Sequence, residues 1–289
     1  MSFVRPQYLV ETEWLAQHLN DPDVRVLECT VYLHPKPEGG FRAESGRAKW
    51  SESHIPGAGF ADLTDELCDR TSPLMYMMPS AEQFGDAMGR AGVGDGVRVV
   101  LYDRVVNMWA ARVWWMLRAF GFENTAVLNG GWKKWTLENR PVATDDGTRL
   151  ARRFVAKPRP ELIADKEAVL AGVGNRATCL INALSEEQHR GTGGVTYGRA
   201  GRVAGSTNVV ARDLVDPTTH AYLPADELRA RFDAAGAMKA GRVITYCGGG
   251  IAASSDAFVL TLLGRDDVAV YDASLSEWAK DPSLPMETG

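Results

Sequence analysis

Short apolar runs alternate with longer amphipathic segments along the chain, and this alternation predicts its secondary structure. In the first half the pattern predicts strands at 24–29, 97–102 and 125–128, and helices at 12–19, 81–91, 109–120 and 132–138. The stretch at 34–53 is polar and glycine-rich, and 62–78 has the turn residues of a long loop. Strands that alternate with helices are typical of a parallel sheet in an α/β domain.

The same kind of pattern begins again after a break in the middle of the chain. Residues 143–160 are rich in Pro, Arg, Asp and Thr and have no clear periodicity, as expected of a linker. Beyond it the pattern predicts strands at 178–183 and 243–246, and helices at 165–171, 226–235 and 251–263. A glycine-rich loop covers 190–205. We therefore expect one domain over 1–142 and a second over 161–289.

The two halves repeat one another in their letters. Arg98-Val-Val-Leu-Tyr-Asp103 matches Arg242-Val-Ile-Thr-Tyr-Cys247, and Leu117-Arg-Ala-Phe-Gly121 matches Leu260-Thr-Leu-Leu-Gly264. A tandem duplication with so little drift in length predicts two similar α/β domains, each a mostly parallel sheet flanked by helices. Asp103 stands where the second copy has Cys247, so any chemistry at this strand end belongs to the second half.

The segment around Cys247 is the main candidate for chemistry. Cys247 ends a predicted strand, three glycines follow it, and a predicted helix begins at Ile251. In open α/β sheets ligands bind at the carboxyl ends of the strands. Glycines let backbone amides turn inward as an anion nest, and a helix N-terminus favours a thiolate. We expect an activated nucleophile here; a buried structural cysteine before an ordinary glycine turn is the alternative.

Composition excludes several classes of protein. The 289 residues are 45% hydrophobic and 24% charged, which is ordinary for a globular protein, and a net charge of −5 argues against nucleic acid as the main partner. The N-terminus has no signal-peptide pattern, and no apolar run reaches the ~18 residues that span a bilayer. The 4 cysteines and 5 histidines are scattered, which predicts no metal site and no disulfide framework. We expect a reduced, cytoplasmic protein without a cofactor.

Several motifs make the chain resemble the tandem-domain rhodanese family of sulfurtransferases. They are Ser53-His-Ile-Pro-Gly-Ala58, Asp69-Arg-Thr-Ser-Pro73, Arg112-Val-Trp-Trp115, Leu128-Asn-Gly-Gly-Trp132 and the Cys247 loop. The resemblance implies an inactive first domain and a catalytic second domain. It further implies that Cys247 takes a sulfur from a donor as a persulfide and passes it to cyanide, a thiol or a protein. Backbone amides would hold the charged sulfur, with Gly248, Gly249, Gly250, Ile251 and Ala252 forming the loop.

The donor is less clear from the sequence. Relatives that use thiosulfate tend to have cations after the cysteine, and relatives that use 3-mercaptopyruvate tend to have Cys-Gly-Ser-Gly. This chain has neither the cations nor the serine. Asp65 matches an acidic residue of the mercaptopyruvate group, but Tyr76 replaces its histidine. The uncharged loop favours 3-mercaptopyruvate over thiosulfate. The expected clamps for the donor's anionic group are Arg190, Arg199 and Arg202.

Two other functions compete with this interpretation. A phosphatase of related fold needs an arginine six residues after the cysteine, and Ala253 holds that position. A binding module without activity, or a persulfide carrier that serves a partner protein, would explain the missing serine and histidine. The retained Cys247 and its three glycines favour the enzyme. The oligomeric state and the acceptor stay open.

Overall fold

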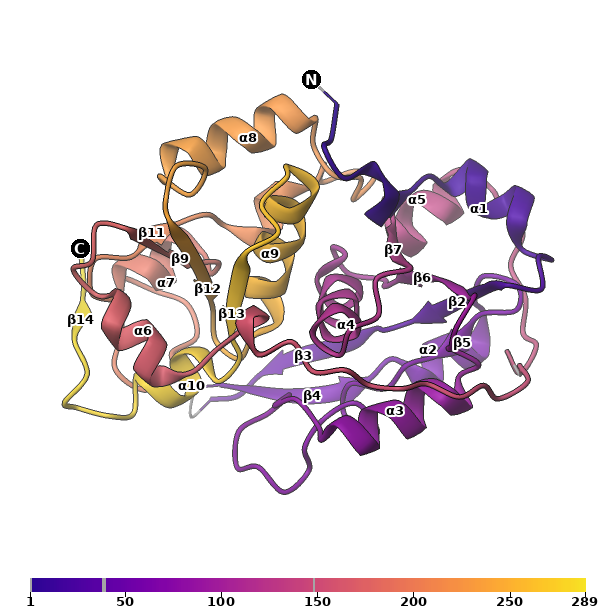
Figure 1. Cartoon of the computed structure of the whole chain (residues 1–289), viewed down its shortest axis with the longest axis horizontal. Coiled ribbons are helices and arrows are strands. Elements are labelled where there is room, and N and C mark those ends of the chain that lie inside the picture. Colours follow the sequence, from indigo (N-terminus) through magenta and orange to yellow (C-terminus); the bar gives the residue numbers. More distant parts are fainter. Residues whose placement is uncertain (1, 38–39, 148) are drawn as a thin grey trace.

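The computed structural model describes residues 2–37, 40–147 and 149–289, which form two α/β domains side by side (Figure 1). The first contains a parallel five-stranded sheet in the order β1-β7-β6-β2-β5. The second contains a parallel sheet in the order β11-β9-β12-β13-β8. From its opposite edge the second sheet reads β8-β13-β12-β9-β11, so its strands follow one another across the sheet as their counterparts do in the first. The predicted fold class and the duplication are confirmed.

The elements of the first domain occupy 9–137. Its sheet strands are β1 (Leu9–Val10), β2 (Val24–Glu28), β5 (Gly59–Phe60), β6 (Arg98–Tyr102) and β7 (Thr125–Leu128). Its helices are α1 (Thr12–His18), α2 (Arg47–Glu52), α3 (Ala81–Arg90), α4 (Met108–Ala119) and α5 (Gly131–Leu137), preceded by the 3-10 turn η1 (Pro6–Tyr8).

The second domain uses the same scheme. Its sheet strands are β8 (Ile163–Ala164), β9 (Thr178–Asn182), β11 (Thr207–Asn208), β12 (Arg242–Tyr246) and β13 (Val268–Tyr271). Its helices are α6 (Lys166–Gly172), α7 (Glu186–Arg190), α8 (Ala225–Ala234), α9 (Ile251–Leu262) and α10 (Ser274–Trp278), with 3-10 turns η2 (Pro160–Leu162) and η3 (Ala211–Leu214). A short antiparallel pair, β10 (Arg202–Val203) and β14 (Met286–Glu287), joins the C-terminus to this domain.

The polar stretch expected at 34–53 is more ordered than its composition indicated. It contains part of an antiparallel hairpin of β3 (Val31–Pro35) and β4 (Phe41–Ser45), and then α2. β3 is exposed after its first two residues, and β4 alternates half-buried with exposed residues, so neither strand forms the apolar run that marks a fully buried strand. The hairpin reaches the second domain, where the ring of Phe41 lies 6.5 Å from that of Tyr197.

Between α5 and η2 the chain forms no helix or sheet strand within its described residues, and it runs along the first domain (Figure 1). Backbone bonds from Arg152 N to Gly89 O (2.9 Å) and from Lys157 N to Phe120 O (2.8 Å) fasten it there. The domain boundaries at 142 and 161 stay predictions. No helix in the described ranges is long and apolar enough to cross a membrane.

The two domains meet along α4 and α9, which lie between the two sheets (Figure 1). Every residue of α4 is buried. The indole of Trp114 meets the ring of Phe258 edge to face at 4.8 Å, and Arg118 Nη1 donates to Thr261 Oγ1 at 3.2 Å. A helix that is buried on all sides needs no polar face, which explains why the sequence at 109–120 shows so little of one.

A buried ion pair crosses the same interface. Arg112 Nη2, on α4, lies 2.6 Å from Asp272 Oδ1, just after β13, and these side chains are 0% and 7% exposed. The same nitrogen donates to the carbonyl of Tyr76 at 2.6 Å, and the Met78 amide donates to Asp272 Oδ2 at 2.9 Å. The pair therefore joins three segments: α4, the loop at 62–78 and the end of β13.

Arg112→Met should lower the free energy of unfolding by about 3–5 kcal/mol, because it leaves the Asp272 carboxylate buried without its counter-ion. Urea denaturation measures this value. The matched control is Arg5→Met, which breaks an ion pair to Asp266 whose side chains are 44% and 40% exposed; we expect a change within about 1 kcal/mol. Equal losses in the two variants would contradict a special role for the buried pair.

Candidate active site

Cys247 lies at the carboxyl end of the central strand of the second sheet, between β9 and β13. It is 3% exposed and is one of four free cysteines. The loop that follows is short, because Gly250 already caps α9 with a left-handed backbone (φ 79°). A Cβ at Gly250 would lie 2.7 Å from Asp272 Oδ1, so both the backbone angle and the space select glycine there.

The first turn of α10 holds the Cys247 loop in place. Ser274 Oγ accepts hydrogen bonds from the amides of Cys247 (3.0 Å) and Gly250 (3.2 Å). The Leu275 amide donates to the Cys247 carbonyl (3.1 Å), and the Ser276 amide donates to the Gly248 carbonyl (2.9 Å). The loop is therefore fixed by bonds to its backbone, and the Cys247 sulfur is left without a hydrogen-bond partner in the described residues.

The amides around the sulfur divide into two groups. Those of Gly249, Ile251 and Ala252 donate to no group in the described parts of the chain, as the predicted anion nest requires. The Gly250 amide, which the sequence also offered as a donor, is taken by Ser274. Free amides at the start of a twelve-residue helix stabilise negative charge beside them.

The equivalent strand end of the first domain shows the same kind of nest already filled. Asp103 follows β6 as Cys247 follows β12, and its carboxylate accepts four backbone hydrogen bonds. These come from Val105 (2.8 Å) and Asn107 (3.1 Å) to Oδ1, and from Trp109 (2.9 Å) and Ala110 (3.0 Å) to Oδ2. This loop binds an anion that belongs to the chain itself, so it has no room for a ligand.

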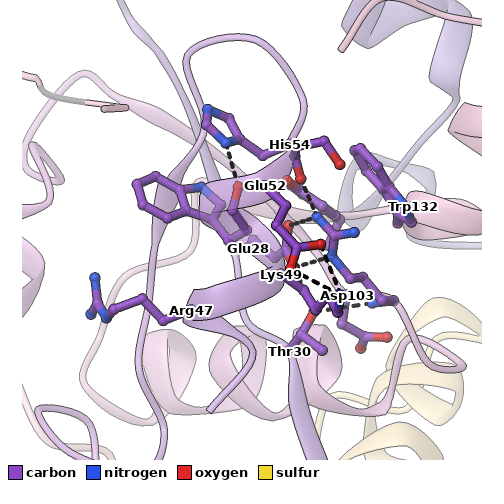
Figure 2. A network of polar contacts seen from close by, with 12 residues as sticks. Glu28, Thr30, Arg47, Lys49, Glu52, His54, Asp103 and Trp132 are labelled. Carbon is purple, nitrogen blue, oxygen red and sulfur yellow. Dashed lines mark hydrogen bonds and ion pairs between the residues drawn. The ribbon is translucent and has the colours of Figure 1, made fainter. Parts of the chain in front are cut away.

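The space beside Asp103 is filled as well (Figure 2). Arg104, the counterpart of Gly248, places its Nε 2.6 Å from Glu28 Oε1 and its guanidinium 4.1 Å from the centre of the Trp132 ring. Thr30 Oγ1 donates to the same Glu28 oxygen (2.9 Å). Side chains occupy the region that stays open in the second domain, which supports an unreactive first domain.

Cys247 opens into a cavity of about 790 Å³ between the two domains. The floor comes from the second domain and includes Cys247, Gly248, Gly249, Ile251, Ala252 and Tyr197. The hairpin β3–β4, the loop that contains Tyr76, and the start of α4 supply the opposite wall from the first domain. The first domain therefore shapes the site although its own strand end is closed.

The three predicted arginine clamps do not line this cavity. Arg190 is exposed and pairs with Glu186 at 2.5 Å, while Arg202 Nη2 lies 3.4 Å from Glu287 Oε2. Arg199 donates to four backbone carbonyls, those of Trp278, Ala279, Asp281 and Leu284. The structure thus shows each of them engaged with its own domain rather than reaching toward Cys247.

The two predicted accessory residues have different positions. Asp65 is exposed and pairs with Arg70 at 2.8 Å, and it does not line the cavity. Tyr76 does line it, in a left-handed backbone conformation (φ 64°), with its ring edge to face with Trp109 at 5.3 Å. Its hydroxyl is buried without a hydrogen-bond partner in the described structure.

Among the cavity residues that the sequence analysis did not single out, four bear on the chemistry. Tyr197 lies against Gly248, and three cations line the cavity without any ion pair or side-chain hydrogen bond in the described residues: Lys36, Arg212 and Lys280. All three cations are exposed. They come from the hairpin, from η3 and from the second residue after α10, segments that no spacing in the sequence brings together.

The other cysteines and the possible metal ligands add no second site. Burial raises the pKa of the Cys29, Cys68 and Cys179 thiols, and none of the three lines the cavity. The described residues contain no cluster of three or more His, Cys, Asp or Glu that would hold a metal ion.

Comparison with known proteins gives one consistent result. A family model described as a rhodanese-like domain matches residues 11–138 and 171–281. Mouse thiosulfate sulfurtransferase is 33% identical, with 97% of this chain and 94% of that protein covered, and human 3-mercaptopyruvate sulfurtransferase is 32% identical, with 93% and 91% covered. The crystal structure of SseA from Escherichia coli, a 3-mercaptopyruvate sulfotransferase, superposes with a TM-score of 0.82 at 29% identity, covering 93% of this chain and 99% of that one.

Ser274→Ala should lower the free energy of unfolding by about 1–3 kcal/mol, because the buried amides of Cys247 and Gly250 lose their common acceptor. Chemical denaturation measures the change. Ser283→Ala is the control, since the Ser283 hydroxyl bonds only to Asp281 at the surface; we expect a change within about 0.5 kcal/mol. A loss in Ser274→Ala no larger than in the control would show that the loop does not depend on this serine.

Proposed function

The chain belongs to the rhodanese family and is a sulfurtransferase, and on this premise we propose that Cys247 carries the transferred sulfur as a persulfide. One observation carries the proposal. Cys247 is a free thiol at a strand end, beside unoccupied backbone amides, in a cavity large enough for a donor and an acceptor.

The reaction takes place in two steps. The Cys247 thiolate attacks the outer sulfur of the donor, the new S–S bond forms, and the bond from that sulfur to the rest of the donor breaks. The terminal sulfur then bears negative charge, which the amides of Gly249, Ile251 and Ala252 are placed to stabilise. A thiophilic acceptor attacks this sulfur and releases the Cys247 thiolate.

We propose 3-mercaptopyruvate as the preferred donor and thiosulfate as the alternative. The groups next to Cys247 are backbone amides and neutral side chains such as Tyr197 and Ile251, while the cations Lys36, Arg212 and Lys280 line the cavity from other segments. Thiosulfate carries two charges on five heavy atoms and needs cations close to the attacked sulfur. 3-Mercaptopyruvate carries its single charge on a carboxylate, at some distance from its sulfur.

Cys247→Ser should abolish sulfur transfer to cyanide from both donors, because an alcohol does not form a persulfide. Mass spectrometry of the wild-type protein should show the mass of one added sulfur on the peptide that contains Cys247. Cys179→Ser is the control, since Cys179 is buried at the amino-terminal part of β9 and does not line the cavity. Transfer that survives in Cys247→Ser would refute the proposed nucleophile, and no transfer in the wild type would favour a non-catalytic binding module.

Arg212→Gln should raise KM for either donor about three- to tenfold, because it removes from the cavity wall a cation that makes no ion pair with any described residue and can attract the donor's anionic group. The effect should shrink at high ionic strength, as expected for an exposed charge. Arg176→Gln is the control. Arg176 is exposed too, but it precedes β9 and so lies at the amino-terminal end of the strands, whereas Cys247 lies at their carboxyl end. An equal change in both variants would show that only the net charge of the molecule matters.

A further inference from the structure

Two of the side chains that line the cavity are phenols whose hydroxyls have no hydrogen-bond partner among the described residues. Tyr76 enters from the first domain and Tyr197 from the second, and both line the cavity. Tyr76 is 8% exposed, and its hydroxyl is buried without a hydrogen-bond partner in the part of the chain that the structure describes. The Tyr197 hydroxyl makes no hydrogen bond within the described residues either.

The ring of Tyr197 lies directly over the glycine that follows the cysteine. A Cβ on Gly248 would be 2.0 Å from Tyr197 Cζ and 2.2 Å from its hydroxyl oxygen, closer than any real contact. A glycine at 248 is therefore what admits the phenol. The hydroxyl therefore lies against Gly248, the neighbour of Cys247. Between Tyr246 and Ile251 the loop has no side chain other than that of Cys247.

The protonation states of the two phenols favour donation. Burial, and after it the neighbouring Cys247, raises the pKa of Tyr197 above its usual value. Burial, then Cys68, then Tyr197 raise the pKa of Tyr76. Both groups consequently keep their protons at neutral pH, and each retains an O–H to give.

From this geometry we propose that the Tyr197 hydroxyl is a catalytic hydrogen-bond donor to the keto oxygen of an α-keto thiol donor such as 3-mercaptopyruvate. The inference rests on the proposed function. The loop itself offers no hydroxyl, since it has Gly249, and Asp65 lies outside the cavity, whereas Tyr197 lies against the neighbour of Cys247. Tyr76 is a positioning residue. Its ring packs edge to face on Trp109 and lines the cavity from the first domain.

The proposed step balances without a co-reactant. The Cys247 thiolate forms a bond to the donor sulfur, and the carbon–sulfur bond breaks. The electron pair passes to the carbon and the neighbouring carbonyl, which becomes an enolate whose oxygen accepts the hydrogen bond from Tyr197. The proton of the donor thiol, left on the new persulfide, passes to the enolate carbon. The products are pyruvate and the persulfide anion.

The two donors should depend on Tyr197 to different extents. The keto oxygen of 3-mercaptopyruvate is neutral in the ground state and gains charge only as the bond breaks, so a hydrogen bond to it stabilises mainly the transition state. Thiosulfate already carries its oxygen charge before the reaction. A hydroxyl that binds it equally in both states affects its binding more than its turnover.

Tyr197→Phe tests this, because it keeps the ring over Gly248 and removes only the hydroxyl. With 3-mercaptopyruvate, kcat/KM should fall about 100-fold, within the range seen when one donor to a developing oxyanion is removed. With thiosulfate it should change by less than about threefold, and kcat/KM for cyanide, which reports the second step alone, should stay within about twofold.

Two further variants keep the outcome interpretable. Tyr222→Phe is the matched control, since the Tyr222 hydroxyl is also buried without a hydrogen-bond partner among the described groups but does not line the cavity; both donors should behave as with the wild type. Gly248→Ala should displace the phenol and lower kcat/KM with 3-mercaptopyruvate at least as much as Tyr197→Phe does.

Equal losses with both donors in Tyr197→Phe, or no loss with 3-mercaptopyruvate, would overturn the inference. These outcomes differ from a failure of the proposed function, in which the wild-type Cys247 gains no sulfur from any donor. A wild type that forms the persulfide with thiosulfate but not with 3-mercaptopyruvate would refute the role of Tyr197 and leave Cys247 as the sulfur carrier.

Discussion

The ion pair between Arg112 and Asp272 is the contact on which the rest of the site depends. Both groups are buried, so each alone would be strongly destabilised, and only their pairing and the hydrogen bonds around them make the arrangement stable. Gly250 touches both: a Cβ there would lie 2.7 Å from Asp272 Oδ1 and 2.9 Å from Arg112 Nη1. Arg112 also fixes the carbonyl of Tyr76. A helix of the first domain thus contacts the cap of α9, from which the amides beside the Cys247 sulfur start.

The duplicated strand ends show how one backbone design gives a closed and an open site. In the first copy, the carboxylate of Asp103 accepts four amides, and Arg104 fills the adjacent space against Glu28. In the second copy Gly248 occupies the position of Arg104, and the sulfur of Cys247 accepts no hydrogen bond from the described amides, whereas the carboxylate of Asp103 accepts four. The second copy therefore lacks the internal stabilisation of a filled nest, and its amides are free to bind the charge that we propose forms on the transferred sulfur.

The sequence predicted the repeated strands and helices well, because each of them is marked by a pattern of apolar residues within its own segment. The apolar runs of β6 and β12 and the helices after them have periodicities that survive in both halves, and the position of Cys247 follows from the repeat. The hairpin β3–β4 was missed because its strands are largely solvated. The arginines were placed by motif alone, yet the direction of a long side chain depends on tertiary partners. Four carbonyls at 278–284 hold Arg199, whereas Arg212, which no motif marks, is left facing the cavity.

The fit between Gly248 and Tyr197 bears on how the sparse Cys-Gly-Gly-Gly loop is understood. A loop that had merely lost its function would have no reason to keep glycine at position 248. At the equivalent strand end of the first domain the same position is occupied by Arg104, whose side chain pairs with Glu28. Here a large ring lies where a Cβ would be, so the bare position has a specific occupant from the same domain. The polar group that the loop lacks is supplied by a residue 50 positions earlier in the numbering, brought there by the segment between α7 and β10. Tertiary contact, rather than the letters of the loop, determines which groups face the sulfur.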